Sequence, residues 1–488
     1  MNPYRVCLFF VLVFAPLALL SWISEDGYIT VGNNTISFLD NEPLFYPKLP
    51  KKKSIEKFVA KVDTTDLIDP IELDSTLLKG DSEMGAPSHT VGKVSTTDFP
   101  IYGDARGFGY LNQFFEQMEN ASAENTKVRI MHYGDSQLEG DRMTAFFRNR
   151  IQSRFGGSGP GTIPAVNVYE TNSFIQRCSD NFVRYTSFGG AKLKGDRYGQ
   201  MATVGRFSKE VNDSAVLANT TTIQTGWIEV AANSRAMGRA KDFNQVYLHY
   251  GNVKKHCSVK VYEGENLILD DSLIEDSKYH SLEMKFAGTP GKLKMVFASA
   301  VSPDFYGISL EGSLGVLVDN VAMRGSSGDW VGKNNYTLLQ KIYEQQNVGL
   351  IIMQYGGNQV PFFTDSMSVV RYGRIFKSQL NKLRKIRPNV AILVLGPSDM
   401  SRFNQGAYET YPKLEQCVRE MKKVALETGC VYWDLYAAMG GENSMSEWVN
   451  QGLAGKDYIH FSPRGSSIAA QLFTDAFFTA FQNWKQTK

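Results

Sequence analysis

Two short segments at opposite ends of the chain carry the residue types of nucleophilic catalysis. Ser136 lies in the motif GDSQ at 134–137, directly after a hydrophobic run. A serine hydroxyl is a weak nucleophile alone and needs a base within hydrogen-bond reach. Asp457 and His460 stand three residues apart. At this spacing a carboxylate can orient one imidazole nitrogen and leave the other free to accept a proton. Together the three side chains could activate serine for acyl transfer.

Two further loops offer hydrogen-bond donors for an oxyanion. Gly325 follows the strand predicted at 316–323, and Asn358 follows the strand predicted at 349–355. A glycine lets a backbone N–H approach closely, and an asparagine amide donates without charge. Gly328 is an alternative to Gly325 in the same loop. Each loop alone is also typical of a tight turn between strand and helix, but their joint occurrence favours a catalytic role.

The elements that must position these residues alternate between strands and helices. Apolar strands are predicted at 128–133, 316–323, 349–355, 390–395 and 430–434, and helices at 337–347, 366–387 and 411–427, with a last helix after Ser462 and Pro463. Strands that are apolar on both faces predict a parallel sheet covered by helices on both sides. Because ligands bind at the carboxyl ends of such strands, the candidate residues should share one edge of the sheet.

A block in the middle of the chain has a different pattern. Short alternating runs at 245–250, 258–262 and 292–297 are separated by Gly, Asn and Asp, which predicts the strands of a β-sandwich. We therefore predict an α/β fold with a hydrolase domain in two parts, at 105–164 and 306–488. A β-sandwich is inserted between them at 165–305.

The composition excludes several classes of protein. The 488 residues are 43% hydrophobic, which is ample for a large core and excludes disordered and coiled-coil chains. The 52 basic and 50 acidic side chains leave a net charge of +2. Such a balanced charge provides no field to attract nucleic acid, so nucleic acid is not an expected partner. The cysteines include no CxxC or Cys/His cluster, and we predict neither a metal nor a cofactor.

The N-terminus resembles an export signal. Arg5 precedes a hydrophobic run at 6–20, and the segment 1–24 is predicted to be either a cleaved signal peptide or an uncleaved membrane anchor. Residues 25–104 are predicted to form an extended linker, since six of the 17 prolines lie between 43 and 100. The rest of the chain is therefore expected outside the cytoplasm, in the bacterial periplasm, secreted, or tethered to the membrane.

The four motifs together resemble the SGNH (GDSL-type) hydrolases, whose blocks bear Ser, Gly, Asn and His in that order. The matching residues are Ser136, Gly325, Asn358 and the pair Asp457 and His460. The resemblance implies a flavodoxin-like three-layer sandwich and a Ser136, His460, Asp457 triad. The backbone N–H groups of Ser136 and Gly325 and the amide of Asn358 would form the oxyanion hole.

The inserted block narrows the resemblance to peptidoglycan O-acetylesterases, in which a carbohydrate-binding-module-like sandwich accompanies the SGNH domain. Gln137, in place of the usual leucine, and Gln359, where many members have aspartate, depart from the family pattern. The resemblance implies a serine esterase that removes O-acetyl groups from peptidoglycan or another glycan. Two alternatives remain open: a polysaccharide O-acetyltransferase with the same triad, and a carbohydrate-binding scaffold with a vestigial catalytic domain.

Overall fold

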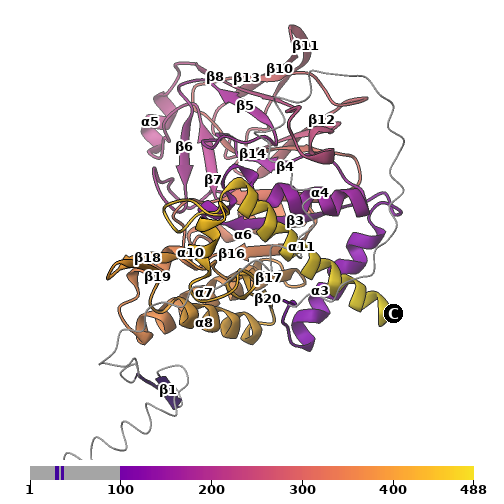
Figure 1. Cartoon of the computed structure of the whole chain (residues 1–488). Helices are drawn as coiled ribbons and strands as arrows, with labels where there is room; N and C mark the ends of the chain where they lie inside the picture. Colours follow the sequence, from indigo (N-terminus) through magenta and orange to yellow (C-terminus); the bar gives the residue numbers. More distant parts are fainter. Residues whose placement is uncertain (1–27, 32–33, 38–98) are drawn as a thin grey trace, which may run out of the picture.

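The computed structural model describes residues 28–31, 34–37 and 99–488, which include an α/β domain and a β-sandwich (Figure 1). The predicted export segment 1–24 lies outside the described residues. Within the predicted linker, β1 (Tyr28–Val31) pairs antiparallel with β2 (Asn34–Ser37). Among the residues that the structure describes, no helix is long and apolar enough to cross a membrane.

A five-stranded parallel sheet forms the centre of the α/β domain. Its strand order is β15-β3-β16-β17-β20, and every neighbouring pair is parallel. The strands are β3 (Lys127–Gly134), β15 (Gly315–Ala322), β16 (Val348–Gln354), β17 (Ala391–Leu395) and β20 (Val431–Trp433). In chain order this is 2-1-3-4-5, the flavodoxin-like order, in which the connections diverge between the first and third strands. The predicted α/β fold class is therefore confirmed, and β3 and β16 flank the expected ligand crevice.

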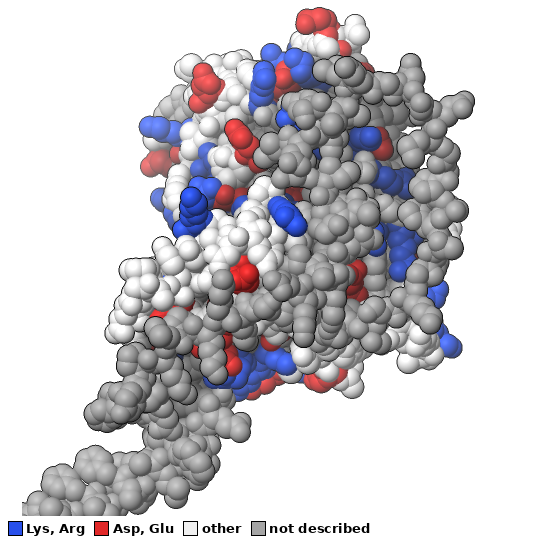
Figure 2. Space-filling view, viewed as in Figure 1, with Lys and Arg blue, Asp and Glu red and all other residues white. Residues whose placement is uncertain are grey.

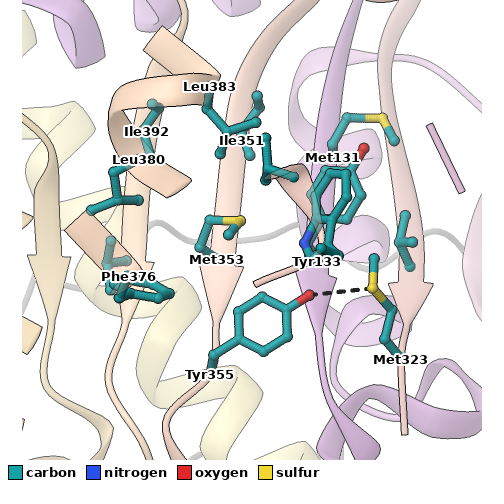
Figure 3. Packing of buried hydrophobic residues seen from close by; sticks show 14 of the residues in the cluster. Met131, Tyr133, Met323, Ile351, Met353, Tyr355, Phe376, Leu380, Leu383 and Ile392 are labelled. Atoms are coloured by element: carbon teal, nitrogen blue, oxygen red, sulfur yellow. Dashed lines mark hydrogen bonds between the residues drawn. The ribbon is translucent and has the colours of Figure 1, made fainter. Parts of the chain in front are cut away.

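Helices cover both faces of this sheet. One face packs against α3 (Ala105–Asn120), α4 (Thr144–Phe155), α9 (Leu435–Ala438), α10 (Ser444–Asn450) and α11 (Pro463–Gln486). The other packs against α6 (Tyr336–Gln345), α7 (Ser366–Ile386) and α8 (Leu414–Glu427). In the second layer, Met353 of β16 and Ile392 of β17 lie near Phe376 and Leu380 of α7 (Figure 3). Continuous apolar strands are buried on both sides here, as their composition requires.

The inserted block is a sandwich of two antiparallel sheets. One has the order β11-β10-β13-β8-β5 and the other β12-β9-β14-β7-β6, with β4 beside β14. The strands are β4 (Gly161–Ile163), β5 (Ile175–Cys178), β6 (Val183–Thr186), β7 (Thr203–Arg206), β8 (Gln224–Ala231), β9 (Gln245–Gly251), β10 (Cys257–Glu263), β11 (Asn266–Ser272), β12 (Tyr279–Lys285), β13 (Leu293–Ser299) and β14 (Asp304–Glu311). A short helix, α5 (Ser214–Asn219), precedes β8. Its strands begin at 161 and end at 311, a few residues outside the range 165–305 given by the sequence.

A buried group of charges joins the two domains. Arg129 on β3 forms ion pairs with Glu311 of β14 and with Asp319 of β15, and Lys127 reaches Glu311 at 2.7 Å. Burial alone would lower the pKa of Arg129, but the two carboxylates outweigh it and raise that pKa above its usual value. An ion pair buried this deeply is costly to break, so the sandwich is fixed against the edge of the parallel sheet.

A small hairpin was not predicted from the sequence. Strands β18 (Ser401–Asn404) and β19 (Ala407–Thr410) pair antiparallel between β17 and α8 and project from the α/β domain on the left of Figure 1. Four residues are too short for a periodic pattern to emerge in the sequence. On the face in Figure 2, the described surface over β18, β19 and α10 carries few charged side chains.

Candidate active site

Ser136 lies in a tight turn at the carboxyl end of β3 and begins the short helix η2 (Ser136–Asp141). Asp135 caps this turn, because its Oδ1 accepts a hydrogen bond from the N–H of Gln137 at 3.0 Å. A Cβ on Gly134 would lie 2.6 Å from the side chain of Leu138, so only glycine fits where the chain bends back. The turn presents the Ser136 hydroxyl at the edge of the sheet, where the sequence placed it.

The loop before α11 brings the histidine and the second carboxylate to this hydroxyl. Ser136 Oγ lies 2.8 Å from His460 Nε2, and His460 Nδ1 lies 2.7 Å from Asp457 Oδ2. Asp457 Oδ1 accepts from the backbone N–H groups of Ile459 and His460 at 3.0 and 3.1 Å. With Nδ1 donating to Asp457, Nε2 is free to accept the proton of Ser136. The structure thus joins three side chains that are up to 324 residues apart.

The electrostatics of Asp457 favour this arrangement. Partial burial alone would raise its pKa, but the hydrogen bonds from the His460 side chain and the two backbone N–H groups lower it below the usual value. The carboxylate therefore stays ionised and can stabilise a positively charged imidazole. The side chains of His460 and Asp457 are 38% and 50% exposed, so the pair is open to substrate and water.

Two residues missed in the sequence fasten the serine turn to the histidine loop. Gln137 Nε2 donates to the carbonyl of Ile459 at 2.8 Å, and Gln137 Oε1 accepts from the N–H of Phe461 at 3.3 Å. Arg142 donates to the carbonyls of Ser136 and Phe461 at 2.7 and 3.2 Å. These bonds hold the backbone on both sides of His460. The departure from leucine at position 137 was the one sequence signal that could have pointed to this role.

The residues proposed for the oxyanion hole lie in neighbouring loops. Asn358 follows β16 in the short helix η5 (Gly357–Phe362), and its Nδ2 lies 3.2 Å from Asp135 Oδ2 and 3.1 Å from the carbonyl oxygen of Ser326. Both N–H groups of the amide thus face protein acceptors, and an oxyanion must compete with one of them. The side chain is next to the serine turn, as predicted, but its donor role stays a prediction.

The structure distinguishes the two candidate glycines in the loop after β15. Both have positive φ, 75° at Gly325 and 83° at Gly328. A Cβ on Gly328 would lie 2.9 Å from the ring of Tyr355, whereas no atom lies within 4 Å of such a position on Gly325. The loop is joined to the serine turn, since Met323 N–H donates to the Gly134 carbonyl at 2.8 Å. Gly325 therefore faces open space, and Gly328 packs into the core.

Asp135 is a second carboxylate beside the nucleophile. It is buried, and burial raises its pKa to about 6, although the N–H of Gln137 acts in the opposite direction. Its Oδ2 holds the amide of Asn358. His132 on β3 is a buried residue that does not serve as the base: burial lowers its pKa to about 3, and its ring nitrogens lie within hydrogen-bond distance of Gln354 and Thr144.

A cleft between the two domains lies beside the end of η2 that is remote from Ser136. Its lining includes Gly140 of η2, Asn320 of β15, and Tyr169 and Arg184 of the inserted block. The guanidinium of Arg324, next to Gly325, lies 5.4 Å from the ring centroid of Tyr169. The inserted block therefore reaches the loop that carries Gly325.

Comparison with known proteins identifies the fold. No protein-family model and no curated protein matches the sequence. The solved structure of a peptidoglycan O-acetylesterase superposes on this chain with a TM-score of 0.58 and is 19% identical in sequence. The match covers 78% of this chain and 99% of the esterase. The chain has the SGNH (GDSL-type) esterase fold. Ser136 and Asn358 follow the first and third strands of the α/β domain, and the Asp457–His460 loop precedes its last helix.

Two more distant structures were also found. A family 2 carbohydrate esterase with a carbohydrate-binding domain, from Corynascus thermopiles (Myceliophthora fergusii), is 11% identical over 52% of this chain and 94% of its own, with a TM-score of 0.26. A catalytic mutant of an acetylxylan esterase from Geobacillus stearothermophilus is 20% identical over 33% and 73%, with a TM-score of 0.24.

Among the residues from 99 to 488 and in the β1–β2 hairpin, no three His, Cys, Asp or Glu side chains gather in a way that could hold a metal ion. The absence of a cofactor stays a prediction. Within the same part of the chain, Cys178, Cys257, Cys417 and Cys430 are all free thiols.

Proposed function

We propose that this chain is a serine esterase that removes O-acetyl groups from a polysaccharide outside the cytoplasm. The observation that carries the proposal is the series of hydrogen bonds from Ser136 Oγ through His460 to Asp457, at 2.8 and 2.7 Å. This geometry is that of an activated serine nucleophile. The SGNH fold, shared with a peptidoglycan O-acetylesterase, supports an acetylated glycan as substrate, as does the inserted sandwich, whose Tyr169 ring contacts Arg324 next to Gly325.

In the first step, Ser136 Oγ attacks the acetyl carbonyl carbon while its proton passes to His460 Nε2. Asp457 stabilises the imidazolium that forms. The carbonyl oxygen becomes an oxyanion that accepts from the backbone N–H groups of Ser136 and Gly325 and from Asn358. The bond from carbon to the sugar oxygen then breaks, and the sugar oxygen takes the proton from His460. Acetyl remains on Ser136 as an ester.

In the second step, water attacks this acetyl ester. His460 Nε2 removes a proton from the water, and the oxyanion forms again at the same donors. The bond to Ser136 Oγ breaks, the hydroxyl regains its proton from His460, and acetate leaves. The exposure of the His460 side chain, 38%, is what this step needs, because water must reach the imidazole.

The nucleophile is tested by Ser136→Ala in the full-length protein. The wild type should cleave 4-nitrophenyl acetate and release acetate from O-acetylated peptidoglycan or acetylated xylan, and the variant should retain only background turnover. Ser378→Ala is a matched control, since it removes an exposed hydroxyl on α7 and leaves Ser136 and the loops around it intact. If the Ser136→Ala protein keeps full turnover at an unchanged unfolding temperature, the proposal is wrong.

The same proteins separate hydrolysis from acetyl transfer. Acetylated glycan with a labelled acetyl group is incubated with an unacetylated acceptor glycan. Labelled free acetate supports the esterase, whereas label on the acceptor would make the chain an O-acetyltransferase. The proposed location rests on the hydrophobic run at 6–20. It is tested by cell fractionation of the full-length chain and of a chain that lacks residues 1–24.

A further inference from the structure

A row of aromatic rings leads away from the candidate active site. Tyr458 stands between Asp457 and His460 in sequence, and its ring stacks on that of Tyr408 with centroids 3.5 Å apart and an angle of 6°. Tyr408 in turn contacts Phe403, at 5.3 Å and 64°. Phe403 and Tyr408 are directly opposite each other on the β18–β19 hairpin. The row therefore connects the catalytic loop with the outer end of the hairpin.

The hairpin has one aromatic face and one polar face. Residues that alternate along a strand point to opposite sides. Phe403 and Tyr408 form a cross-strand pair, and the next pair, Arg402 and Glu409, forms an ion pair at 3.5 Å. The aromatic face is the one that stacks on Tyr458, so it is turned toward the catalytic loop. Phe403 nevertheless remains 65% exposed and Tyr408 36%.

The base of the hairpin is held rigidly. Buried Asp399 accepts hydrogen bonds from Thr410 Oγ1 at 2.8 Å and from the N–H of Met445 at 2.7 Å. The N–H of Ser401 donates to the carbonyl of Tyr458 at 2.9 Å. A two-stranded hairpin is not stable in water by itself. These contacts give it a fixed position beside the histidine loop, with its aromatic rings still partly in solvent.

Tyr458 shows that the row and the catalytic loop are coupled. Its φ is 57°, a left-handed conformation that costs a residue with a side chain about 1 kcal/mol or more. Stacking on Tyr408 helps to hold this conformation. The same backbone turn places the N–H groups of Ile459 and His460 on Asp457. The ring of Tyr458 is thus positioned by the loop that positions the imidazole.

We propose that Phe403, Tyr408 and Tyr458 form a stacking platform for the sugar rings of a polymeric glycan, next to the acetylated sugar at Ser136. The inference rests on the proposed esterase function and specifies how that site binds a polymer. A pyranose ring presents a face of C–H groups that packs on the face or edge of an aromatic ring. Rings that begin at the catalytic loop and continue outward suit a chain longer than one sugar.

Other occupants fit these features less well. From their exposed fractions, Phe403 and Tyr408 together expose roughly 200 Å², far below the about 800 Å² that each partner buries in a stable protein complex. An anionic membrane surface would need unpaired basic residues around the rings, whereas Arg402 is paired with Glu409. In Figure 2 few charges lie over this part of the described surface. A neutral sugar chain matches such a surface.

The test compares a small ester with a polymer in the full-length protein. Phe403→Ala should raise KM for acetylated xylan or O-acetylated peptidoglycan about 3- to 10-fold, with kcat/KM for 4-nitrophenyl acetate within twofold of the wild type. Tyr408→Ala should raise the KM for these polymers by at least as much and should also slow the cleavage of the small ester, because its ring supports Tyr458 in the catalytic loop. Tyr408→Phe keeps the ring and should match the wild type on both substrates. Tyr336→Ala on α6 is the matched control, because Tyr336 is 37% exposed and Tyr408 36%.

The outcomes separate this inference from the proposed function. An unchanged KM for both polymers in Phe403→Ala and Tyr408→Ala overturns the platform. An equal loss on the small ester in Phe403→Ala also overturns it, since the hairpin would then only support the catalytic loop. If the wild type cleaves no ester, the esterase proposal fails, and the platform is still tested by binding. Xylohexaose or chitohexaose should bind the Ser136→Ala protein more tightly than a protein that carries both Ser136→Ala and Phe403→Ala. Equal affinities of the two proteins overturn the inference.

Discussion

Replacing Asp457 by asparagine should reverse the proton pattern of the His460 imidazole. In the wild type, Asp457 Oδ1 accepts from two backbone N–H groups, and Oδ2 faces His460 Nδ1 at 2.7 Å. In Asp457→Asn the amide oxygen must stay on the backbone donors, because an amide nitrogen there would face two N–H groups. The amide nitrogen then donates to Nδ1. The ring proton moves to Nε2, which can no longer accept the proton of Ser136.

The size of the effect follows from the tautomer and from exposure. In serine triads, an asparagine that enforces the wrong tautomer lowers kcat about 10⁴-fold. Here the side chains of Asp457 and His460 are 50% and 38% exposed, so solvent screens the lost charge and water can partly replace it. We therefore expect a loss of about 10³-fold in kcat, which corresponds to about 4 kcal/mol in the barrier, with little change in KM.

The assay is the steady-state cleavage of 4-nitrophenyl acetate, with the unfolding temperature as the measure of folding. Asp457→Ala is the informative control. It removes the carboxylate but supplies no N–H to Nδ1, so the imidazole keeps both tautomers and activity should exceed that of Asp457→Asn. Two results would refute the reasoning: a kcat for Asp457→Asn within tenfold of the wild type, or a less active Asp457→Ala with an unchanged unfolding temperature.

Three further predictions concern the donors and the buried charges. Asn358→Ala should lower kcat by ~10²–10³, because one oxyanion donor is lost, with KM for the small ester nearly constant. The pKa of Asp135 is raised from 3.8 to about 6, so between these values the folded chain holds a proton that the unfolded chain has released. The free energy of unfolding should therefore fall by up to about 3 kcal/mol as pH rises from about 4 to 6. Urea unfolding at a series of pH values measures this decrease, and Asp135→Asn should lack the contribution of Asp135. An equal decrease in both proteins contradicts the prediction. Arg129→Met leaves Glu311 and Asp319 without their shared cation. It should lower the free energy of unfolding, measured in urea, by roughly 3–5 kcal/mol. A decrease below about 1 kcal/mol would show that the ion pairs contribute little.

The α/β fold could be predicted because its strands leave a strong local signal. A strand buried on both faces must be apolar throughout, and helices of the same domain carry an apolar stripe at a different period. The predicted strand 349–355 and helix 366–387 correspond closely to β16 (Val348–Gln354) and α7 (Ser366–Ile386). Parallel strands also end at one edge, so GDSQ and the Asn358 loop could be placed near each other without coordinates.

The details of the site depend on contacts that no local pattern reveals. The hydrogen bonds of Gln137 and Arg142 to Ile459 and Phe461 span more than 300 residues and depend on the path of two loops. The acceptors of the Asn358 amide likewise come from two other segments. Such groups are ordinary polar residues in the sequence, and only their neighbours in space give them a role.

What the sequence determined by itself was the order of strands and helices and the presence of serine, aspartate, histidine and asparagine at loop positions, because hydrophobic periodicity and residue chemistry are local properties. Only the tertiary structure decided that Gly325 faces open space while Gly328 packs on Tyr355. It also set the rings of Tyr408 and Tyr458 face to face. Distances between side chains are fixed by the packing of whole elements, and packing is a property of the entire chain.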